Sequence, residues 1–155
     1  MSVRTGSCLC GGVKAELRGE PFMKNLCHCT SCQKITGGVF GSLASYKTEQ
    51  VTFTESEPSV LKTYTDTSPE SGAVLWRSFC GRCGGPVRAQ RASHPGILAI
   101  PVGFVDGDKA AFRPQLELFC RGRADWVGAV VADPSKAYDT LPVQNFDTMP
   151  PAADS

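Results

Sequence analysis

Hydrophobic and polar residues alternate with a period of two along much of this chain, and this pattern predicts β-strands with one buried face. Between residues 13 and 18, Val13, Ala15 and Leu17 alternate with charged residues. Further segments alternate in the same way or are rich in β-forming residues: 51–54, 60–65, 73–79, 97–100 and 116–120. We therefore expect a mainly β protein built from antiparallel sheets.

Turn signals separate these segments, and the 16 glycines and 11 prolines indicate many turns and short elements rather than a helical bundle. One short helix is expected at Ser31–Thr36, where Gly37-Gly38 would end it. The length favours one domain, which we expect over residues 1–127. Residues 128–155 contain four prolines and little periodicity, so we expect a C-terminal tail that is partly packed or disordered.

Charge excludes some classes of partner. Sixteen basic and fifteen acidic residues give a formal net charge of +1, so no strong field favours nucleic acid or anionic lipid. No apolar run reaches the length of a membrane span. The first six residues show no apolar signal segment, and we therefore expect a cytoplasmic protein in a reducing compartment.

Eight cysteines carry the candidate chemistry. Two pairs, Cys8-Leu9-Cys10 and Cys80-Gly81-Arg82-Cys83, are each followed at once by Gly-Gly. Glycine can take a positive φ, so the backbone can fold back and bring its N–H groups towards the thiolates. The pairs are therefore predicted to form two halves of one closed zinc site, with Cys8 and Cys10 entering a strand.

Three more cysteines, Cys27, Cys29 and Cys32, lie within six residues and have no evident fourth partner. A structural zinc normally has four protein ligands, whereas a zinc that does chemistry keeps one position open. On an extended strand, Cys27 and Cys29 face one side and His28 faces the other. We therefore expect His28 to be packed or hydrogen-bonded rather than a metal ligand.

Disulfides are an alternative use of eight cysteines, but a reducing compartment favours metal ligation of closely spaced thiols. The 41% hydrophobic content is also enough for a core without covalent cross-links. An iron–sulfur cluster would usually gather four cysteines in one recognisable run or a run plus a remote ligand. Zinc is the metal that this pattern favours.

Other side chains have ordinary structural interpretations. Cys120 is expected to be a buried thiol, and His94 a turn residue. Trp76, Phe79 and Trp126 are expected in the core. Three arginines near the second cysteine pair could bind carboxylates, although solvated surface positions are the simpler expectation: Arg77, Arg82 and Arg88.

The order of three motifs makes a more specific comparison possible. They are Cys-x-Cys-Gly-Gly from residue 8, Cys-His-Cys-x-x-Cys-Gln-Lys-x-x-Gly from residue 27, and Phe-Cys-x-x-Cys-Gly from residue 79. Over residues 6–127 the chain resembles the glutathione-dependent formaldehyde-activating enzyme family, whose domain also occurs in centromere protein V. The resemblance implies a β-tent fold of folded-over sheets and two zinc ions.

By this resemblance, Cys8, Cys10, Cys80 and Cys83 are structural zinc ligands, and Cys27, Cys29 and Cys32 hold a catalytic zinc. The family's named reaction joins formaldehyde to glutathione as S-(hydroxymethyl)glutathione, a carbon–sulfur lyase reaction in reverse. The resemblance thus implies a zinc-dependent lyase acting on glutathione–aldehyde adducts.

A second class of function stays open, namely a zinc-stabilised binding module for protein or chromatin. The three-cysteine group favours the enzyme, because a binding module needs no unsaturated metal. Expected partners are a small-molecule thiol and an aldehyde, without nucleic acid or membrane, and a homodimer is compatible with the sequence.

Overall fold

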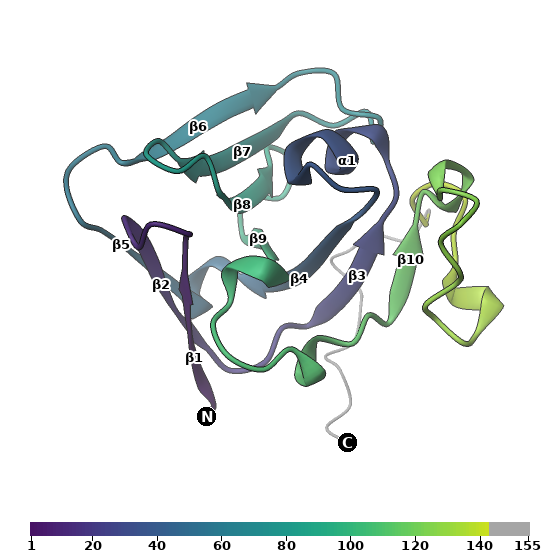
Figure 1. Cartoon of the computed structure of the whole chain (residues 1–155), viewed down its shortest axis with the longest axis horizontal. Helices are drawn as coiled ribbons and strands as arrows, with labels where there is room; N and C mark the ends of the chain where they lie inside the picture. The colour runs from purple at the N-terminus through teal and green to yellow at the C-terminus, as the bar shows by residue number, and fades with distance from the viewer. Residues whose placement is uncertain (143–155) are drawn as a thin grey trace.

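The computed structural model describes residues 1–142 of the chain. These residues form two β-sheets (Figure 1). The smaller sheet has three antiparallel strands in the order β1-β2-β5. Its strands are β1 (Val3–Ser7), β2 (Val13–Arg18) and β5 (Val51–Glu55). Because Val13, Ala15 and Leu17 of β2 are buried and the residues between them are not, the alternation of this strand marks its core-facing side.

The larger sheet has seven strands in the order β10-β3-β4-β9-β8-β7-β6. Its strands are β3 (Met23–Cys27), β4 (Gly41–Lys47), β6 (Leu61–Asp66), β7 (Leu75–Cys80), β8 (Pro86–Arg91), β9 (Ile97–Pro101) and β10 (Leu116–Leu118). The expectation of a mainly β fold is confirmed. The pairs within both sheets are antiparallel as expected, except at one edge of the larger sheet, where β10 runs parallel to β3.

The two faces of the larger sheet pack against different parts of the chain. One face contributes Ala44, Tyr46, Leu98 and Ile100 to a core shared with β2. The other face belongs to a second cluster that includes Leu116, Leu118, Phe119 and the three cysteines of residues 27–32. The alternation of β4 and β9 therefore separates a structural core from the region that holds the candidate site.

A single α-helix, α1 (Thr30–Thr36), follows β3 directly, and five 3₁₀ turns complete the regular structure of residues 1–142: Thr48–Gln50, Val102–Phe104, Ala110–Phe112, Cys120–Gly122 and Pro134–Lys136. The Cys29 side chain caps the N-terminus of α1, and Gly37 ends it with φ of 67°. The predicted short helix is thus confirmed. No helix among the described residues is long and apolar enough to cross a membrane.

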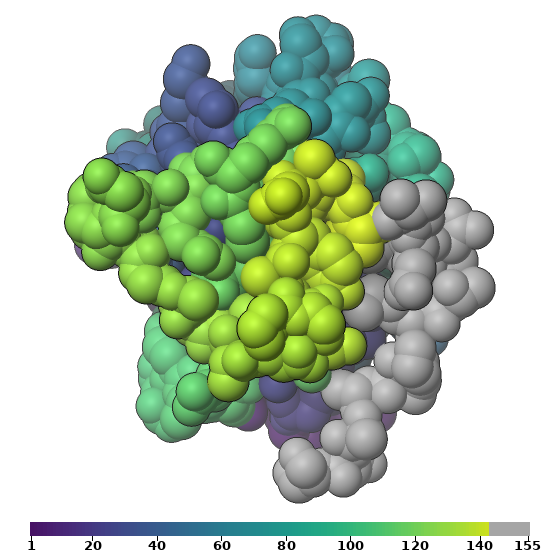
Figure 2. Space-filling view, turned by 90° about the vertical axis from the view of Figure 1, so that its right-hand side faces the viewer, coloured from purple at the N-terminus to yellow at the C-terminus, as the bar shows by residue number. Residues whose placement is uncertain are grey.

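The chain after β10 packs back along the edge of the larger sheet. The Tyr138 N–H donates to the Glu117 carbonyl at 2.8 Å, and the Cys120 N–H donates to the Tyr138 carbonyl at 2.9 Å. Figure 2 shows this segment, in green and yellow-green, spread over one face of the molecule. Hydrogen bonds thus tie part of the expected tail to the larger sheet, although most of residues 128–142 are exposed, and residues 143–155 lie outside the described part of the chain.

Two expectations about aromatic residues are wrong. Trp126 has 74% of its surface exposed and Trp76 has 37%, so neither lies in the core, while Phe79 is half-buried. Trp76 lies on β7 beside the edge strand β6, and Trp126 follows the 3₁₀ turn Cys120–Gly122 in irregular chain. Aromatic size alone did not indicate burial at these positions.

Candidate active site

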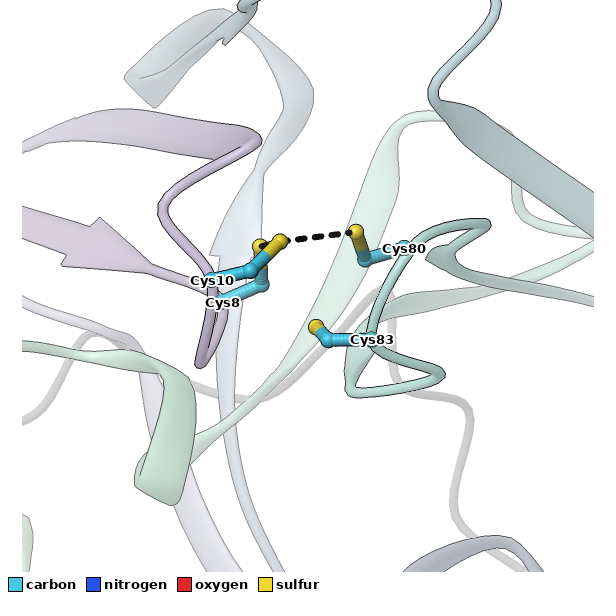
Figure 3. Close-up of side chains that lie close together, drawn as sticks. All are labelled: Cys8, Cys10, Cys80 and Cys83. Atoms are coloured by element: carbon cyan, nitrogen blue, oxygen red, sulfur yellow. Dashed lines mark hydrogen bonds between the residues drawn. The ribbon is translucent and has the colours of Figure 1, made fainter.

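Four cysteines from two distant turns meet where the sheets come together (Figure 3). Cys8 and Cys10 lie in the turn between β1 and β2, and Cys80 and Cys83 flank the turn between β7 and β8. The four sulfur atoms, called here the four-cysteine cluster, all lie within 4.8 Å of one another. Cys8 and Cys10 were expected to enter a strand; they instead lie in a turn, which brings their sulfurs 3.7 Å apart by folding the backbone back.

These separations fit a metal site. A tetrahedral zinc with Zn–S bonds of about 2.3 Å holds its sulfurs about 3.8 Å apart. The Cys10 and Cys80 sulfurs are 3.6 Å apart, close to that edge length, and all eight cysteines are free thiols. The donor set and its spacing therefore suit one zinc ion linking the two sheets.

The glycines that follow the two cysteine pairs have the backbone conformation that the Gly-Gly flanks predict. Gly11 and Gly84 have φ of 73° and 74°, in the left-handed region that favours glycine. The Val13 N–H donates to the Cys8 sulfur at 3.2 Å. The N–H groups of Gly85 and Cys10 lower the pKa of the Cys83 thiol to about 6, which favours the thiolate that a metal requires.

Three other cysteines form a second group, the three-cysteine cluster, at the junction of β3 and α1. Cys27 ends β3, Cys29 caps α1, and Cys32 lies in its first turn; all three are buried. Their sulfurs also lie within 4.8 Å of one another, and no other Cys, His, Asp or Glu of residues 1–142 joins the group. The protein as described thus offers three soft ligands, a set that suits a zinc with one non-protein ligand.

Cys29 is the thiol of this cluster that ionises first. The Cys27 and Cys32 thiols and the backbone N–H of Cys32 all donate towards its sulfur, the last at 3.3 Å. These donors hold the pKa of Cys29 far below its usual range even though burial opposes the charge. The neighbouring thiols first, and the helix cap second, therefore favour the thiolate form of Cys29.

His28 lies between two of these cysteines but points away from them, as the strand geometry predicts. It is fully buried, and its Nε2 lies 3.0 Å from Oε1 of Glu117 on β10. Its ring also meets Phe40 edge to face at a centroid distance of 5.8 Å. His28 is therefore a hydrogen-bonded core histidine.

Glu117 is a residue of this region that the sequence reasoning missed. It is completely buried, and its Oε2 accepts hydrogen bonds from the N–H groups of Val130 and Val131 at 2.9 and 3.1 Å. Burial would raise its pKa, but His28, these two N–H groups and Arg123 together hold it below the ordinary value. A charged residue between two leucines of a short strand was the available signal.

A pocket opens onto the three-cysteine cluster. Its walls come from one face of the larger sheet, from α1, from the β6–β7 loop and from the chain after β10, and most of the wall is apolar: Met23, Leu43, Pro69, Leu75, Ala89, Ile97, Ala99, Leu118, Phe119 and Leu141. Its polar lining, besides the three cysteines, consists of Asn25, Ser45, Glu70, Ser71, Arg77, Arg91 and His94. Glu70 is held by Arg121 Nη2 at 2.8 Å and by the Thr30 N–H at 3.0 Å, which lower its pKa.

The three arginines suggested as carboxylate binders fall in different places. Arg77 was expected on the surface, but it is buried in the pocket wall, where its Nε donates to Asp66 at 2.8 Å. Arg82 is on the surface near Glu57, and Arg88 lies over the Phe53 ring. Arg77 can be buried because Asp66, on the neighbouring strand β6, provides an acidic partner for its charge.

Two further expectations can be placed. His94 lies in the β8–β9 turn, as expected, and also lines the pocket. Cys120 was expected to be buried, but it is only half-buried at the start of a 3₁₀ turn, where Arg123 Nη2 donates to its sulfur at 3.4 Å. It belongs to neither cysteine cluster.

Comparisons with known proteins agree with this arrangement. A crystal structure of a Rhodobacter sphaeroides protein from structural genomics is similar, with a TM-score of 0.55 and 20% identity over 73% of this chain and 97% of that chain. At this identity the likeness shows the fold alone. No curated protein matches the sequence. The sequence model for "Glutathione-dependent formaldehyde-activating enzyme" matches residues 3–122, which include both cysteine clusters. The chain therefore belongs to the glutathione-dependent formaldehyde-activating enzyme family.

Proposed function

We propose that this protein is a zinc-dependent enzyme of the carbon–sulfur lyase type that makes or splits the adduct of a small thiol and an aldehyde, with glutathione and formaldehyde as the first pair to test. One observation carries the proposal. The three-cysteine cluster lines a pocket, whereas a purely structural zinc site needs no access for small molecules.

The two clusters have different proposed roles. Cys8, Cys10, Cys80 and Cys83 would hold a structural zinc, and their place between the two sheets supports the β-tent description of the fold. Cys27, Cys29 and Cys32 would hold the zinc of the active site. Seven thiolate ligands need a reducing compartment, which supports a cytoplasmic location.

Zinc at the three-cysteine cluster would stabilise a substrate thiolate and could polarise an aldehyde carbonyl. In the synthetic direction the thiol sulfur forms a bond to the aldehyde carbon, the C=O π bond breaks, and the proton lost by the thiol ends on the new hydroxyl. The reverse direction restores thiol and aldehyde. No oxidant or reductant is needed.

The protein's own residues prepare this reaction. The neighbouring thiols and the Cys32 N–H lower the pKa of Cys29, and the buried His28–Glu117 pair fixes the backbone between Cys27 and Cys29. The apolar pocket walls limit water around a thiol held beside the cluster and bring it close to the aldehyde.

Cobalt substitution tests the proposal directly. Protein loaded with Co²⁺ at both clusters already absorbs through its cysteine ligands, and this cobalt–thiolate absorption should become stronger and shift when glutathione is added. S-methylglutathione, whose sulfur cannot ionise, should leave the spectrum unchanged. If glutathione and other thiols also leave it unchanged, the enzyme proposal fails and a zinc-stabilised binding module becomes the better account.

A further inference from the structure

Asn25 of β3 is a buried amide in the wall of the pocket. It is only 3% exposed, and its side chain makes no hydrogen bond within residues 1–142. An unpaired amide destabilises a fold unless a bound water or a ligand becomes its partner. Asn25 therefore marks a place in the pocket where a polar group of a ligand would be held.

The neighbours of Asn25 offer its side chain no partner. On the two adjacent strands it lies opposite Leu43 of β4 and Leu116 of β10. Along β3, the residues on its own face are Met23 and Cys27, which line the pocket with it. Since most of the wall is apolar, a hydrogen bond from the amide to a ligand is stronger here than in water.

The position of Asn25 on β3 places its amide within reach of a ligand held at the three-cysteine cluster. Asn25 and Cys27 face the same side of the strand, because they are two residues apart. A strand rises about 3.3 Å per residue, which separates the two residues by about 6.6 Å. A hydrogen bond to the Asn25 amide takes up about 2.9 Å of that distance. The remainder suits an oxygen two or three bonds away from a sulfur at the cluster.

In the proposed reaction, the oxygen at this distance is the one that the aldehyde brings. When the thiol sulfur bonds to the carbonyl carbon, the π electrons of the C=O bond move to the oxygen. The oxygen stays negative until it takes the proton that the thiol has lost. An N–H group that already points at this oxygen in an apolar site stabilises the transition state, because the donor needs no rearrangement.

We propose that the side-chain amide of Asn25 donates a hydrogen bond to the aldehyde-derived oxygen of the adduct and so holds the aldehyde against the thiol. This inference rests on the proposed function, since it needs a thiol at the three-cysteine cluster. It makes Asn25 a catalytic residue that is not a candidate ligand of either cluster.

Two thiols of equal length test the role of Asn25. 2-Mercaptoethanol carries a hydroxyl group where 1-propanethiol carries a methyl group. Each thiol is titrated into cobalt-loaded wild-type and Asn25→Leu protein, and the ratio of the two dissociation constants is compared between the proteins. Leucine has the branched shape of asparagine without its polar atoms. Asn25→Leu should therefore shift the ratio about tenfold against 2-mercaptoethanol, which corresponds to about 1.4 kcal/mol, without weakening the binding of 1-propanethiol.

Stability and rate measurements separate this role from a structural one. Because the Asn25 amide has no partner in the described chain, Asn25→Leu should melt at the wild-type temperature or higher. At saturating glutathione, the rate of adduct formation from formaldehyde should fall about 100-fold, which is typical of the loss of one such donor.

Ser45→Ala is the matched control. Ser45 also lines the pocket and is 3% exposed, but it lies opposite Met23, two residues farther along β3 from Cys27 than Asn25 is. This variant loses a polar group of the same wall and should keep the wild-type ratio of the two dissociation constants.

The outcomes separate the two proposals. If neither thiol changes the cobalt spectrum of wild-type protein, the proposed function itself fails. If both thiols bind and the ratio is the same in wild-type and Asn25→Leu protein, the proposed function stands and the role of Asn25 is overturned. The role of Asn25 is also overturned if Ser45→Ala shifts the ratio as far as Asn25→Leu does.

Discussion

At the scale of single residues, the backbone of His28 is fixed on several sides. Its N–H donates to the Leu118 carbonyl at 2.9 Å, its carbonyl accepts from Gln33 Nε2 at 2.9 Å, and its ring meets Glu117. Because His28 lies between Cys27 and Cys29, these contacts also set the directions of two cysteine side chains. The three-cysteine cluster therefore depends on residues that are not candidate ligands.

Glu117→Gln should weaken the fold. Hydrogen bonds to a charged group contribute about 1.5–3 kcal/mol, and the amide lacks the charge and cannot accept from every donor that meets Glu117. We expect a loss of about 2–3 kcal/mol at pH 7, seen as a lower urea midpoint with an unchanged slope. An unchanged midpoint would show that the buried carboxylate is neutral or unimportant.

The same pair of proteins gives a pH test. The pKa of Glu117 is lowered in the folded state, so its carboxylate stabilises the fold above the unfolded value of about 4.3. That contribution is lost as the pH falls through the folded pKa. The difference in unfolding free energy between wild type and Glu117→Gln should therefore be largest at about pH 6–7. It should become smaller below about pH 4, because the ordinary pKa of a glutamate lies near this value.

Gly122→Ala should disturb the three-cysteine cluster through the backbone. A Cβ at Gly122 would lie 2.6 Å from the His28 carbonyl oxygen, whereas a Cβ at Gly128 would meet nothing within 4 Å. Overpacking of this kind costs about 1–3 kcal/mol. We expect Gly122→Ala to lower the melting temperature and the cobalt affinity of this cluster, and Gly128→Ala to change neither. Equal behaviour of the two variants would contradict the proposed role of the His28 backbone.

At the scale of elements, the four-cysteine cluster connects turns from different sheets. Cys8 and Cys10 belong to the β1–β2 turn of the smaller sheet, and Cys80 and Cys83 belong to the β7–β8 turn of the larger one. The three-cysteine cluster, in contrast, joins β3 to the helix that follows it directly. Loss of metal should therefore have different structural consequences at the two clusters.

Cys83→Ser should abolish cooperative folding. Structural zinc contributes about 10–16 kcal/mol in zinc-finger peptides, which is comparable to the whole stability of a domain. We expect the variant to lose one zinc per chain and its thermal transition. Cys120→Ser is the matched control, because Cys120 lies outside both clusters, and it should keep the wild-type zinc content and melting temperature. A Cys83→Ser protein that melts like wild type would refute the structural assignment.

Cys29→Ser should keep the fold and lose metal at the three-cysteine cluster. The variant retains the link between the sheets, so circular dichroism and a cooperative transition should persist while zinc falls by one per chain. The cobalt–thiolate response to glutathione should disappear. Unfolding as complete as that of Cys83→Ser would make this cluster structural and remove the basis of the proposed active site.

At the scale of the whole molecule, the chain after β10 spreads over one side of the protein (Figure 2), and part of it packs beside the three-cysteine cluster. Val130 and Val131 donate to the Glu117 side chain, and Tyr138 and Leu141 pack against the apolar residues around the cysteines. A domain ending at residue 127 would lack these contacts. The family match ends at residue 122, before this segment.

Truncation tests this dependence. A chain of residues 1–127 loses the backbone hydrogen bonds to Glu117, at about 1 kcal/mol each, and should melt roughly 6–12 °C lower than the full chain. Its affinity for cobalt should fall at the three-cysteine cluster and stay unchanged at the four-cysteine cluster. A chain of residues 1–142 keeps every described contact and serves as the control. Equal melting of both truncated chains would show that the segment is dispensable.

Local patterns determined much of this protein. The strands β2, β5, β6, β7, β9 and β10 fall on segments with clear alternation or β-forming residues, because a strand with one buried face imposes a period of two. The cysteine spacing and Gly-Gly flanks also indicated two separate groups, since turn geometry and ligand spacing are local properties. The short helix was also predicted, because two glycines directly after it mark its end.

Tertiary structure decided the rest. β1, β3, β4 and β8 contain small or polar residues with weak alternation, and they become strands through pairing with their neighbours. The parallel β10, the buried Arg77 and the buried Glu117 depend on partners that are distant in the sequence. No local pattern predicts such partners, because the free energy of burying a charge is set by the groups that the fold brings to it.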